Sequence, residues 1–256
     1  MQKNLLGSAA SNAQAMLLLY LLNPCYEEKP IMKIMLASGS PRRYDLLRQM
    51  EWDVEVRSLP FDEAETVEEA KEKLSALSDQ KCKTVFAETD ITLLSACQNE
   101  NLVCAYNALG KGRAVANTID TASPVIAADT IVVLGNTILG KPSDASDAIR
   151  MLRMLSGKAH QVKTAVAVLY QDKTQLRVIT TNVHFRKLEE SEIKWYVGTG
   201  EPMDKAGAYG IQGKGAVLVE RIEGSYDNVV GLPLTAVYEM LLSAGAPVKL
   251  RQETLT

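Results

Sequence analysis

Two adjacent arginines, Arg42 and Arg43, follow a Ser-Gly-Ser loop and a proline in the segment Leu-Ala-Ser-Gly-Ser-Pro-Arg-Arg (36–43). The apolar run 34–37 predicts a buried strand, and the amphipathic pattern after the loop predicts a helix. Ser40 is placed as the N-cap and the proline as the first helical residue, so both arginines fall in the first turn. Cations there oppose the helix dipole, whereas the free backbone N–H groups attract anions. The segment therefore indicates a site for a small polyanion such as phosphate. The alternative is two solvated arginines at a helix end.

Asp129 lies within an apolar, β-branched run, Val-Ile-Ala-Ala-Asp-Thr-Ile-Val-Val-Leu (125–134), that predicts a buried strand. A buried carboxylate without a partner is costly, so Asp129 must meet a cation, a metal ion or hydrogen-bond donors. The alternative is a strand-end aspartate that caps a nearby loop. Glu63 belongs to the acidic loop 61–65 and is solvated if it acts alone. If it meets Asp129, two carboxylates and phosphate oxygens make a hard oxygen site suited to Mg²⁺ or Mn²⁺.

Two lysines and a glycine-rich loop complete the polar candidates. Lys141 lies between a glycine and a proline, and Lys111 lies between two glycines within the predicted helix 108–117. Each lysine alone is typical of a surface charge. The loop 201–215 does not match GxGxxG, and the chain has no Walker A sequence, so neither dinucleotide nor P-loop chemistry is supported. The amide of Gln212 can pair with a base edge as donor and acceptor together, with a structural turn as the alternative.

The totals narrow the classes of protein and of partner. The chain has 256 residues, of which 46% are hydrophobic, and a formal net charge of −3. This suits one large α/β domain or two small lobes, and the lack of a basic surplus argues against nucleic acid as a partner. Four cysteines without CxxC spacing and only two histidines argue against a zinc site and a Ser-His-Asp triad. The cysteine usage fits a reducing cytoplasm.

Strand and helix signals follow one another along the chain, which predicts an α/β fold with a mixed sheet. Residues 78–107 show mixed polarity and no clear period, and we assign no element there. Predicted strands are 34–37, 52–56, 125–134, 137–139, 161–170, 176–185 and 214–222. Predicted helices are 67–77, 108–117, 145–155, 189–197 and 233–244, besides the one that begins at Pro41.

The first 31 residues hold one short apolar run, 16–22, with a single preceding lysine. The run is too short to span a bilayer, so no membrane partner is expected. It also makes a weak signal peptide, and Asn23 and Pro24 make a poor lipobox before Cys25. We therefore predict that residues 1–31 are a dispensable extension. Met32 then stands as an alternative start.

Together, these segments resemble the Maf family of nucleoside triphosphate pyrophosphatases, from about Lys33 to the last helix. The resemblance implies a two-lobed Maf-like α/β fold around a central mixed β-sheet, with a cleft between the lobes. It also implies hydrolysis of a nucleoside triphosphate to the monophosphate and pyrophosphate with a divalent metal cation, Mg²⁺ or Mn²⁺. Eight segments in the family's order carry it: LASGSPRR (36–43), the acidic pair 62–63, Lys111, AADTIV (127–132), LGKP (139–142), LSGKAHQVKTAVAV (155–168), EPMDKAGAYGIQG (201–213) and NVVGLPL (228–234).

The resemblance also implies residue roles. Asp129 matches the catalytic proton acceptor, and Glu63 with Asp129 matches the metal ligands. The matching substrate- and phosphate-binding residues are Ser38, Arg42, Arg43, Lys111 and Lys141. Arg42, Thr130 and Gln212 match the branch that acts on dTTP and UTP, whereas the branch acting on 7-methyl-GTP has Trp, Gln and Glu at these points. The implied enzyme is a nucleotide diphosphatase that cleaves the α–β phosphoanhydride of dTTP, UTP and modified pyrimidine nucleotides, and a homodimer is a family expectation.

The chain departs from the family pattern in two places. The spacing from Glu63 to Lys111 exceeds that of a compact member, which predicts an insertion near 66–107 within a domain of residues 32–248, followed by a tail, 249–256. Gly110 and Gly112 stand where the family has Glu or Gln and Ala, and each glycine lowers helix propensity by about 1 kcal/mol. Two other functions stay open: a nucleotide-binding regulator of septation with weak or no catalysis, and an inosine triphosphatase of related architecture.

Overall fold

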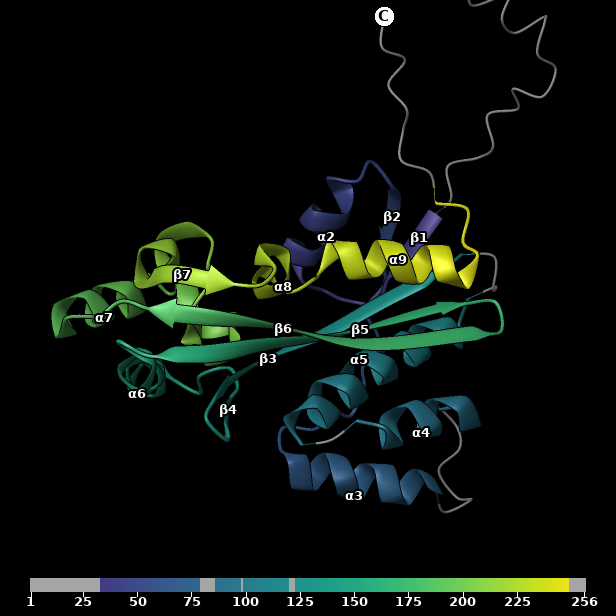
Figure 1. Cartoon of the computed structure of the whole chain (residues 1–256), viewed down its shortest axis with the longest axis horizontal. Helices are drawn as coiled ribbons and strands as arrows, with labels where there is room; N and C mark the ends of the chain where they lie inside the picture. Colours follow the sequence, from purple (N-terminus) through teal and green to yellow (C-terminus); the bar gives the residue numbers. More distant parts are fainter. Residues whose placement is uncertain (1–32, 79–85, 98, 120–122, 249–256) are drawn as a thin grey trace, which may run out of the picture. The chain divides into compact units, whose positions relative to one another are not determined.

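A mixed seven-stranded sheet organises the part of the chain that the computed structural model describes, residues 33–78, 86–97, 99–119 and 123–248 (Figure 1). The strand order is β2-β1-β3-β5-β6-β7, and β4 pairs with β3. The predicted extension 1–31 and tail 249–256 lie outside the described residues. The strands are β1 (Lys33–Leu36), β2 (Asp53–Val56), β3 (Val125–Leu134), β4 (Thr137–Leu139), β5 (Ala159–Tyr170), β6 (Lys173–Phe185) and β7 (Val219–Glu223).

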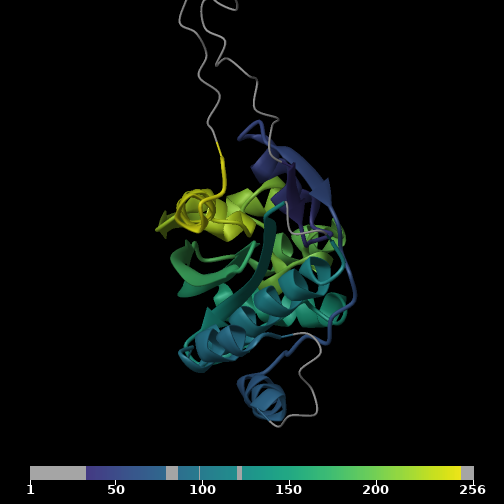
Figure 2. The same ribbon diagram turned by 90° about the vertical axis from the view of Figure 1, so that its right-hand side faces the viewer.

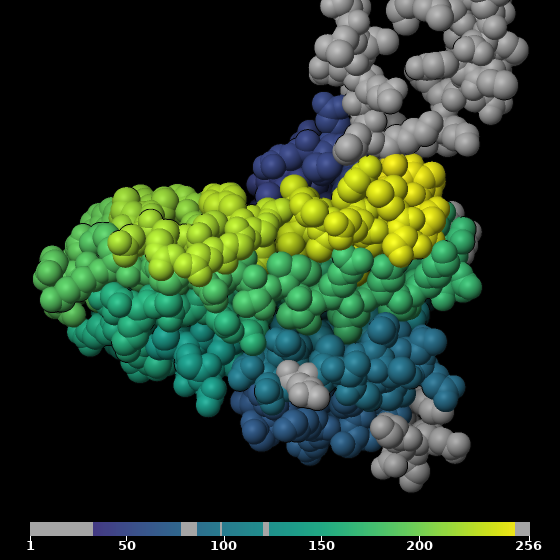
Figure 3. Space-filling view, in the orientation of Figure 1, coloured from purple at the N-terminus to yellow at the C-terminus, as the bar shows by residue number. Residues whose placement is uncertain are grey.

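Helices cover both faces of this sheet (Figures 1 and 2). The α-helices are α2 (Pro41–Arg48), α3 (Val67–Ser78), α4 (Glu88–Ser95), α5 (Glu100–Ala116), α6 (Ala145–Leu155), α7 (Glu190–Gly198), α8 (Tyr226–Val230) and α9 (Leu234–Ala244). Three short 3₁₀ helices are η1 (Glu201–Asp204), η2 (Ala206–Ala208) and η3 (Gly213–Leu218). Helix α5 packs on β3 and β5, and α3 and α4 pack on α5. Figure 3 shows α9 against the β5–β6 hairpin, with the α3–α5 segment beneath it.

Strand β3 runs through the centre of the sheet and is buried on both faces. It pairs in parallel with β1 and antiparallel with β4 and β5. Its residues alternate between two cores: Val125 and Ala127 face the α5 side, while Ile126 and Ala128 face the α2 and α9 side. This double burial explains why the sequence shows a continuous apolar run rather than polar alternation.

Most predicted elements are found within three residues of their predicted ends, and two differ more. The predicted helix 108–117 is the second half of α5, and the unassigned segment contains α4 and the start of α5. The predicted strand 214–222 is wrong in its first half, because residues 213–218 form η3 and β7 begins at Val219. Ser40 is the N-cap residue of α2, but its side chain makes no capping bond; its backbone N–H instead donates to Ser38 Oγ at 3.2 Å.

The described residues include two of the four cysteines. Cys97 and Cys104 are both free thiols, and burial raises the pKa of each. No described helix combines the length and the apolar character that crossing a membrane needs.

Candidate active site

A pocket of about 1090 Å³ lies where α2, α5, β3 and the loop around η1 and η2 meet. Its volume slightly exceeds the range of about 300–1,000 Å³ that is usual for small-molecule sites. Every residue that the sequence singled out for chemistry lines it: Ser38, Arg42, Arg43, Glu63, Lys111, Asp129, Thr130, Lys141 and Gln212. The fold therefore brings together six segments that are separate in the chain.

Asp129 lies in the middle of β3, opposite Ala165 of β5, and its side chain is 13% exposed. Two side chains from α5 reach it. Lys111 Nζ lies 2.8 Å from Asp129 Oδ1, and Asn107 Nδ2 donates to Oδ2 at 3.2 Å. The buried carboxylate thus has the cation and the hydrogen-bond donor that its place in an apolar strand requires.

Lys111 also meets the second predicted acid. Its ammonium lies 2.7 Å from Glu63 Oε2, so one cation bridges Glu63 and Asp129. The position of the ammonium shows that both carboxylates can reach one cationic centre, as two ligands of a single metal ion must. Among the described residues, no group of three His, Cys, Asp or Glu side chains could hold a metal ion. A metal here would therefore need additional oxygen ligands, as Mg²⁺ sites completed by substrate phosphates do.

The two glycines beside Lys111 are explained by close packing. A Cβ at Gly110 would lie 2.0 Å from the ring of Phe61, and one at Gly112 would lie 2.7 Å from Leu169 Cδ1. Both glycines stand inside α5, where they weaken helix propensity, but they let an aromatic ring and a strand approach the helix axis. The helix continues through both positions and points Lys111 into the pocket.

Arg43 is held from three sides at the floor of the pocket. Nε donates to the carbonyl of Gly231 at 2.8 Å, Nη1 to Ser38 Oγ at 3.1 Å and Nη2 to Thr130 Oγ1 at 3.1 Å. Burial lowers the pKa of the Arg43 guanidinium, and the negative charge of Asp129 opposes that change. With a guanidinium's ordinary pKa above 12, Arg43 stays charged and carries a fixed positive charge beside Asp129.

Arg42 points to the opposite wall. Its Nη1 lies 3.0 Å from Asp204 Oδ2, and Lys205 Nζ lies 2.6 Å from Asp204 Oδ1. Burial opposes ionisation of Asp204, but hydrogen bonds from Lys205 and Arg42 hold the pKa of this carboxyl below its ordinary value. The ion pair is partly exposed, so a ligand anion can compete with Asp204 for Arg42.

Lys141 and Gln212 stand at the exposed rim. Both side chains are exposed, and both line the pocket. The chain next to Lys141 is fixed by a bond from the Gly207 N–H to the Gly140 carbonyl at 3.0 Å. The loop after Gln212 is fixed by Glu201, whose carboxylate accepts from the N–H groups of residues 214 and 215.

Behind the pocket wall, a buried histidine supports Tyr209. His160 Nε2 and Tyr209 Oη lie 2.8 Å apart, and Tyr209 lines the pocket. Burial, with a smaller contribution from the nearby His184, lowers the pKa of His160 from 6.5 to about 4. His160 is therefore neutral near pH 7 and acts as part of the scaffold.

Asn107 is a site residue that the sequence did not reveal. It lies in the segment to which we assigned no element, and its side chain lines the pocket beside Asp129. One signal was available: Asn107 precedes Lys111 by four residues, so a helix extended by one turn would put both on one face.

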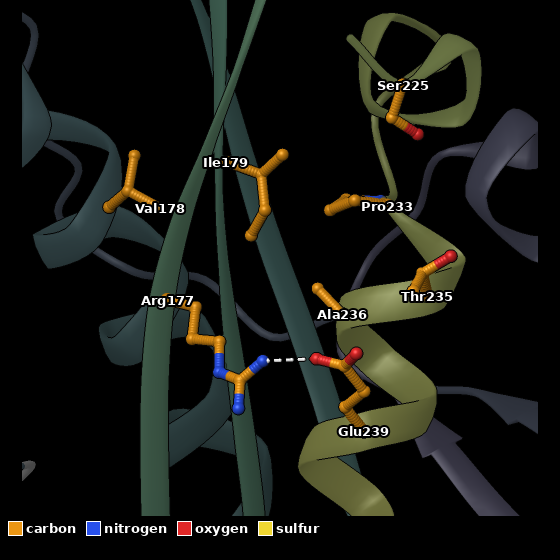
Figure 4. Close-up of a pocket in the computed structure, with 8 residues that line it drawn as sticks. All are labelled: Arg177, Val178, Ile179, Ser225, Pro233, Thr235, Ala236 and Glu239. Carbon is orange, nitrogen blue, oxygen red and sulfur yellow. Dashed lines mark hydrogen bonds and ion pairs between the residues drawn. The ribbon is translucent and has the colours of Figure 1, made fainter.

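A second, smaller hollow of about 600 Å³ lies between β6 and α9 (Figure 4). One half-exposed ion pair, Arg177 Nη1 to Glu239 Oε2 at 2.7 Å, crosses it. Its other lining residues are Val178, Ile179, Ser225, Pro233, Thr235 and Ala236. None of these eight residues was predicted to take part in chemistry, whereas all of the predicted site residues line the larger pocket.

The chain is similar in sequence to a protein family and to several proteins called dTTP/UTP pyrophosphatases. A model of the family described as Maf-like protein matches residues 33–244. A dTTP/UTP pyrophosphatase of Anaeromyxobacter dehalogenans is 42% identical over 221 residues, which cover 84% of this chain and 96% of that protein. Proteins of the same name from Bacillus cytotoxicus and Dictyoglomus thermophilum are 43% and 42% identical, over 82% and 83% of this chain and 94% and 96% of their own lengths.

Proposed function

The chain belongs to the Maf family, and on that premise we propose that it is a nucleotide diphosphatase that hydrolyses dTTP and UTP to the monophosphate and pyrophosphate. The observation that carries the proposal is the pocket itself, whose lining brings the four predicted cationic side chains together with the carboxylates of Glu63 and Asp129. The three similar proteins named above, which are called dTTP/UTP pyrophosphatases, support the same substrate class. They give no support to a regulator of septation.

We assign the cationic residues to the triphosphate. Arg43 is fixed and keeps guanidinium N–H groups for the phosphate oxygens. Arg42 and Lys111 can exchange their carboxylate partners for phosphate oxygens, and the Lys141 side chain is exposed. Ser38 Oγ accepts from Arg43 and from the Ser40 N–H, so its own proton is directed to another acceptor, for which a phosphate oxygen is suited. Such fixed charges stabilise the charge that develops in phosphoryl transfer.

Asp129 is assigned as the proton acceptor. Its carboxylate is oriented by Asn107 and Lys111, and it takes a proton from the water that attacks the α-phosphorus. A bond forms between the water oxygen and the α-phosphorus, the bond from that phosphorus to the α–β bridging oxygen breaks, and pyrophosphate leaves. Glu63 and Asp129 would hold a divalent cation, which when bound neutralises phosphate charge and favours ionisation of water.

Selectivity for pyrimidine nucleotides is assigned to Arg42, Thr130 and Gln212. Gln212 offers an amide at the rim, and Thr130 is locked between Arg43 and Thr164, whose hydroxyl lies 3.0 Å from its own. The reducing cytoplasm and a homodimer remain expectations of the same proposal.

A hydrolysis screen tests the proposed function. The full chain is incubated with Mg²⁺ or Mn²⁺ and each of dTTP, UTP, CTP, GTP, ATP and modified pyrimidine triphosphates, and monophosphate and pyrophosphate are quantified. We expect turnover to be fastest with dTTP and UTP and to yield equal amounts of both products. Release of inorganic phosphate alone, or binding of triphosphates without any turnover, would contradict the proposal.

A further inference from the structure

Residues 61–66, here called the Glu63 loop, carry one of the two proposed metal ligands without any regular structure of their own. The loop connects β2 to α3. The Glu63 side chain is 49% exposed, and it pairs with the end of the long Lys111 side chain. Asp129, by contrast, is fixed by its place in the central strand. The separation of the two carboxylates therefore depends on what holds the backbone of this loop.

Helix α5 holds the loop from one side through Asn107. Its Nδ2 donates to the carbonyl of Ala64 at 2.9 Å, and its Oδ1 accepts from the N–H of Ala64 at 2.8 Å. The same Nδ2 donates to Asp129 Oδ2 at 3.2 Å, and the residue is 4% exposed. One buried amide thus ties the residue after Glu63 directly to the proposed proton acceptor.

Helix α3 holds the loop from the other side through Lys73. Its Nζ donates to the carbonyl of Glu63 at 2.6 Å and lies 2.9 Å from Asp62 Oδ1. Glu69, one turn earlier on α3, lies 2.9 Å from Lys73 Nζ and accepts from the N–H of Glu65 at 2.9 Å. The Lys73 side chain is only 18% exposed, so these bonds are shielded from water in part.

Aromatic packing fixes the start of the loop. The ring of Phe61 lies 6.0 Å from that of Phe86 and 5.3 Å from that of Tyr106. It also covers Gly110, where a side chain would collide with it. Helix α3 and Phe86 both fall in the segment 66–107 that the sequence predicts to be an insertion, so residues of this segment support the Glu63 loop.

We infer that Asn107 and Lys73 are positioning residues that hold Glu63 at the distance from Asp129 at which the pair binds one cation. Helix α3 thereby sets the cation affinity of the pocket although none of its residues lines the pocket. The inference rests on the proposed function, because it takes Glu63 and Asp129 as the cation-binding pair. Residues that orient metal ligands typically change metal affinity about 10- to 100-fold when removed.

Manganese binding by the full-length chain tests the inference. The variants are Lys73→Met and Asn107→Leu, and the controls are Lys71→Met, at an exposed position of α3, and Asn101→Leu, earlier on α5. Binding is followed by loss of the electron paramagnetic resonance signal of free Mn²⁺, alone and with an uncleavable α,β-methylene triphosphate. We expect both positioning variants to bind Mn²⁺ about 10-fold more weakly and both controls to stay within twofold of the parent chain.

Two further readouts separate positioning from a loss of folding. In Lys73→Met, the rate of pyrophosphate release at saturating Mn²⁺ should fall much less than the Mn²⁺ affinity, and Lys73→Arg, which keeps the donor, should retain most of the affinity of the parent chain. Unchanged Mn²⁺ affinity in Lys73→Met and Asn107→Leu would overturn the inference, and so would equal losses in the control variants.

Glu63→Gln and Asp129→Asn distinguish failure of the inference from failure of the proposed function. If these two variants lose Mn²⁺ affinity and the positioning variants do not, only the inference fails. If neither of them changes Mn²⁺ binding, the proposed cation pair is wrong and the inference falls with it.

Discussion

Helix α5 carries two cations, two residues apart, that meet carboxylates in opposite ways. Lys111 faces the pocket and bridges Glu63 and Asp129, both of which keep some contact with solvent. Arg113 faces away from the pocket and pairs with Asp90 of α4, whose side chain is fully buried. Residues i and i+2 lie on different sides of a helix, so one element serves two regions that share no side chain.

The difference lies in how completely each acid is satisfied. Asp90 receives a forked pair from Arg113, with Nε to Oδ2 at 2.5 Å and Nη2 to Oδ1 at 2.8 Å, and also the N–H of Ala87. Arg113 Nη2 reaches Thr174 on β6 as well, so this cluster ties α4 to the sheet. Lys111 is a compact point charge with flexible reach and partly exposed partners. A closed pair builds scaffold, whereas an open pair can exchange partners with a ligand.

The largest expected effect separates the two clusters through Asp129→Asn. The substitution keeps size and hydrogen bonding but removes the proton acceptor, so turnover should fall about 10²- to 10⁴-fold while nucleotide binding stays measurable. Steady-state pyrophosphate release, nucleotide binding and thermal unfolding of the same preparation check this. Near-normal turnover would refute the role of Asp129.

The matching change in the scaffold cluster is Asp90→Ala. It removes the fully buried acid and leaves the Arg113 guanidinium, whose side chain is only 19% exposed, without its carboxylate. This should lower the free energy of unfolding by about 3–5 kcal/mol. Urea denaturation measures the change, with Lys33→Ala as a control that removes a surface pair with Glu55 and should cost less than about 1 kcal/mol. Below the unfolding temperature, turnover should stay within a few fold. A large loss of turnover at unchanged stability would place this cluster in catalysis.

Acid should act on the scaffold through His160. Its pKa lies near 4 in the folded chain and near 6.5 when unfolded, so the unfolded chain binds more protons between these values. The stabilisation is thus complete above pH 6.5 and is lost as the pH falls toward 4. At about 1.4 kcal/mol per pH unit, the loss reaches up to about 3 kcal/mol.

The variant His160→Gln isolates that contribution, because glutamine can still bond to Tyr209 but does not titrate. Urea denaturation from pH 4 to 7.5 should show a flatter pH dependence in the variant than in the parent chain. Identical slopes would mean that His160 is not the group that titrates.

The smallest expected effect comes from Arg113→Lys. Lysine keeps a positive charge beside Asp90 but cannot make the two parallel hydrogen bonds of the guanidinium. The free energy of unfolding should therefore fall by about 2 kcal/mol, less than for Asp90→Ala. Lys111→Arg is the counterpart in the pocket: stability should hardly change, while the KM for dTTP should shift. Denaturation and steady-state kinetics on both variants test whether fork geometry matters only in the closed cluster.

The elements that the sequence predicted well are those with one clear environment. β3 shows a β-branched run because it is buried on both faces, and α6 shows both a helical period and its cap, Asp144, which accepts from the N–H of Asp147. The first half of α5 was missed because residues 102–110 are all buried, which removes the polar face that gives a helix its period. The start of β7 was misjudged because the apolar residues 216–218 of η3 run directly into the strand and extend its pattern.

The candidate site divides in the same way. Arg42, Arg43, Asp129 and Gln212 stand in local patterns that are unusual by themselves, and the pocket does contain them. Asn107 and Lys73 carry no such pattern, since an asparagine and a lysine on a helix are ordinary. Their importance comes from the backbone groups that they bind: Asn107 meets Ala64, 43 positions away, and Lys73 meets Glu63, 10 positions away.

Local sequence patterns were enough to predict most of the elements in their order, the buried strand that carries Asp129 and the family to which the chain belongs. These follow from local chemistry: apolar periodicity, turn residues and motifs that need no knowledge of distant neighbours. The folded chain was needed to show which acid each cation of α5 meets, why glycines flank Lys111 and what supports Glu63. Those outcomes depend on contacts between segments far apart in the chain, and the free energy of such contacts is set by the packed geometry rather than by the residues on either side.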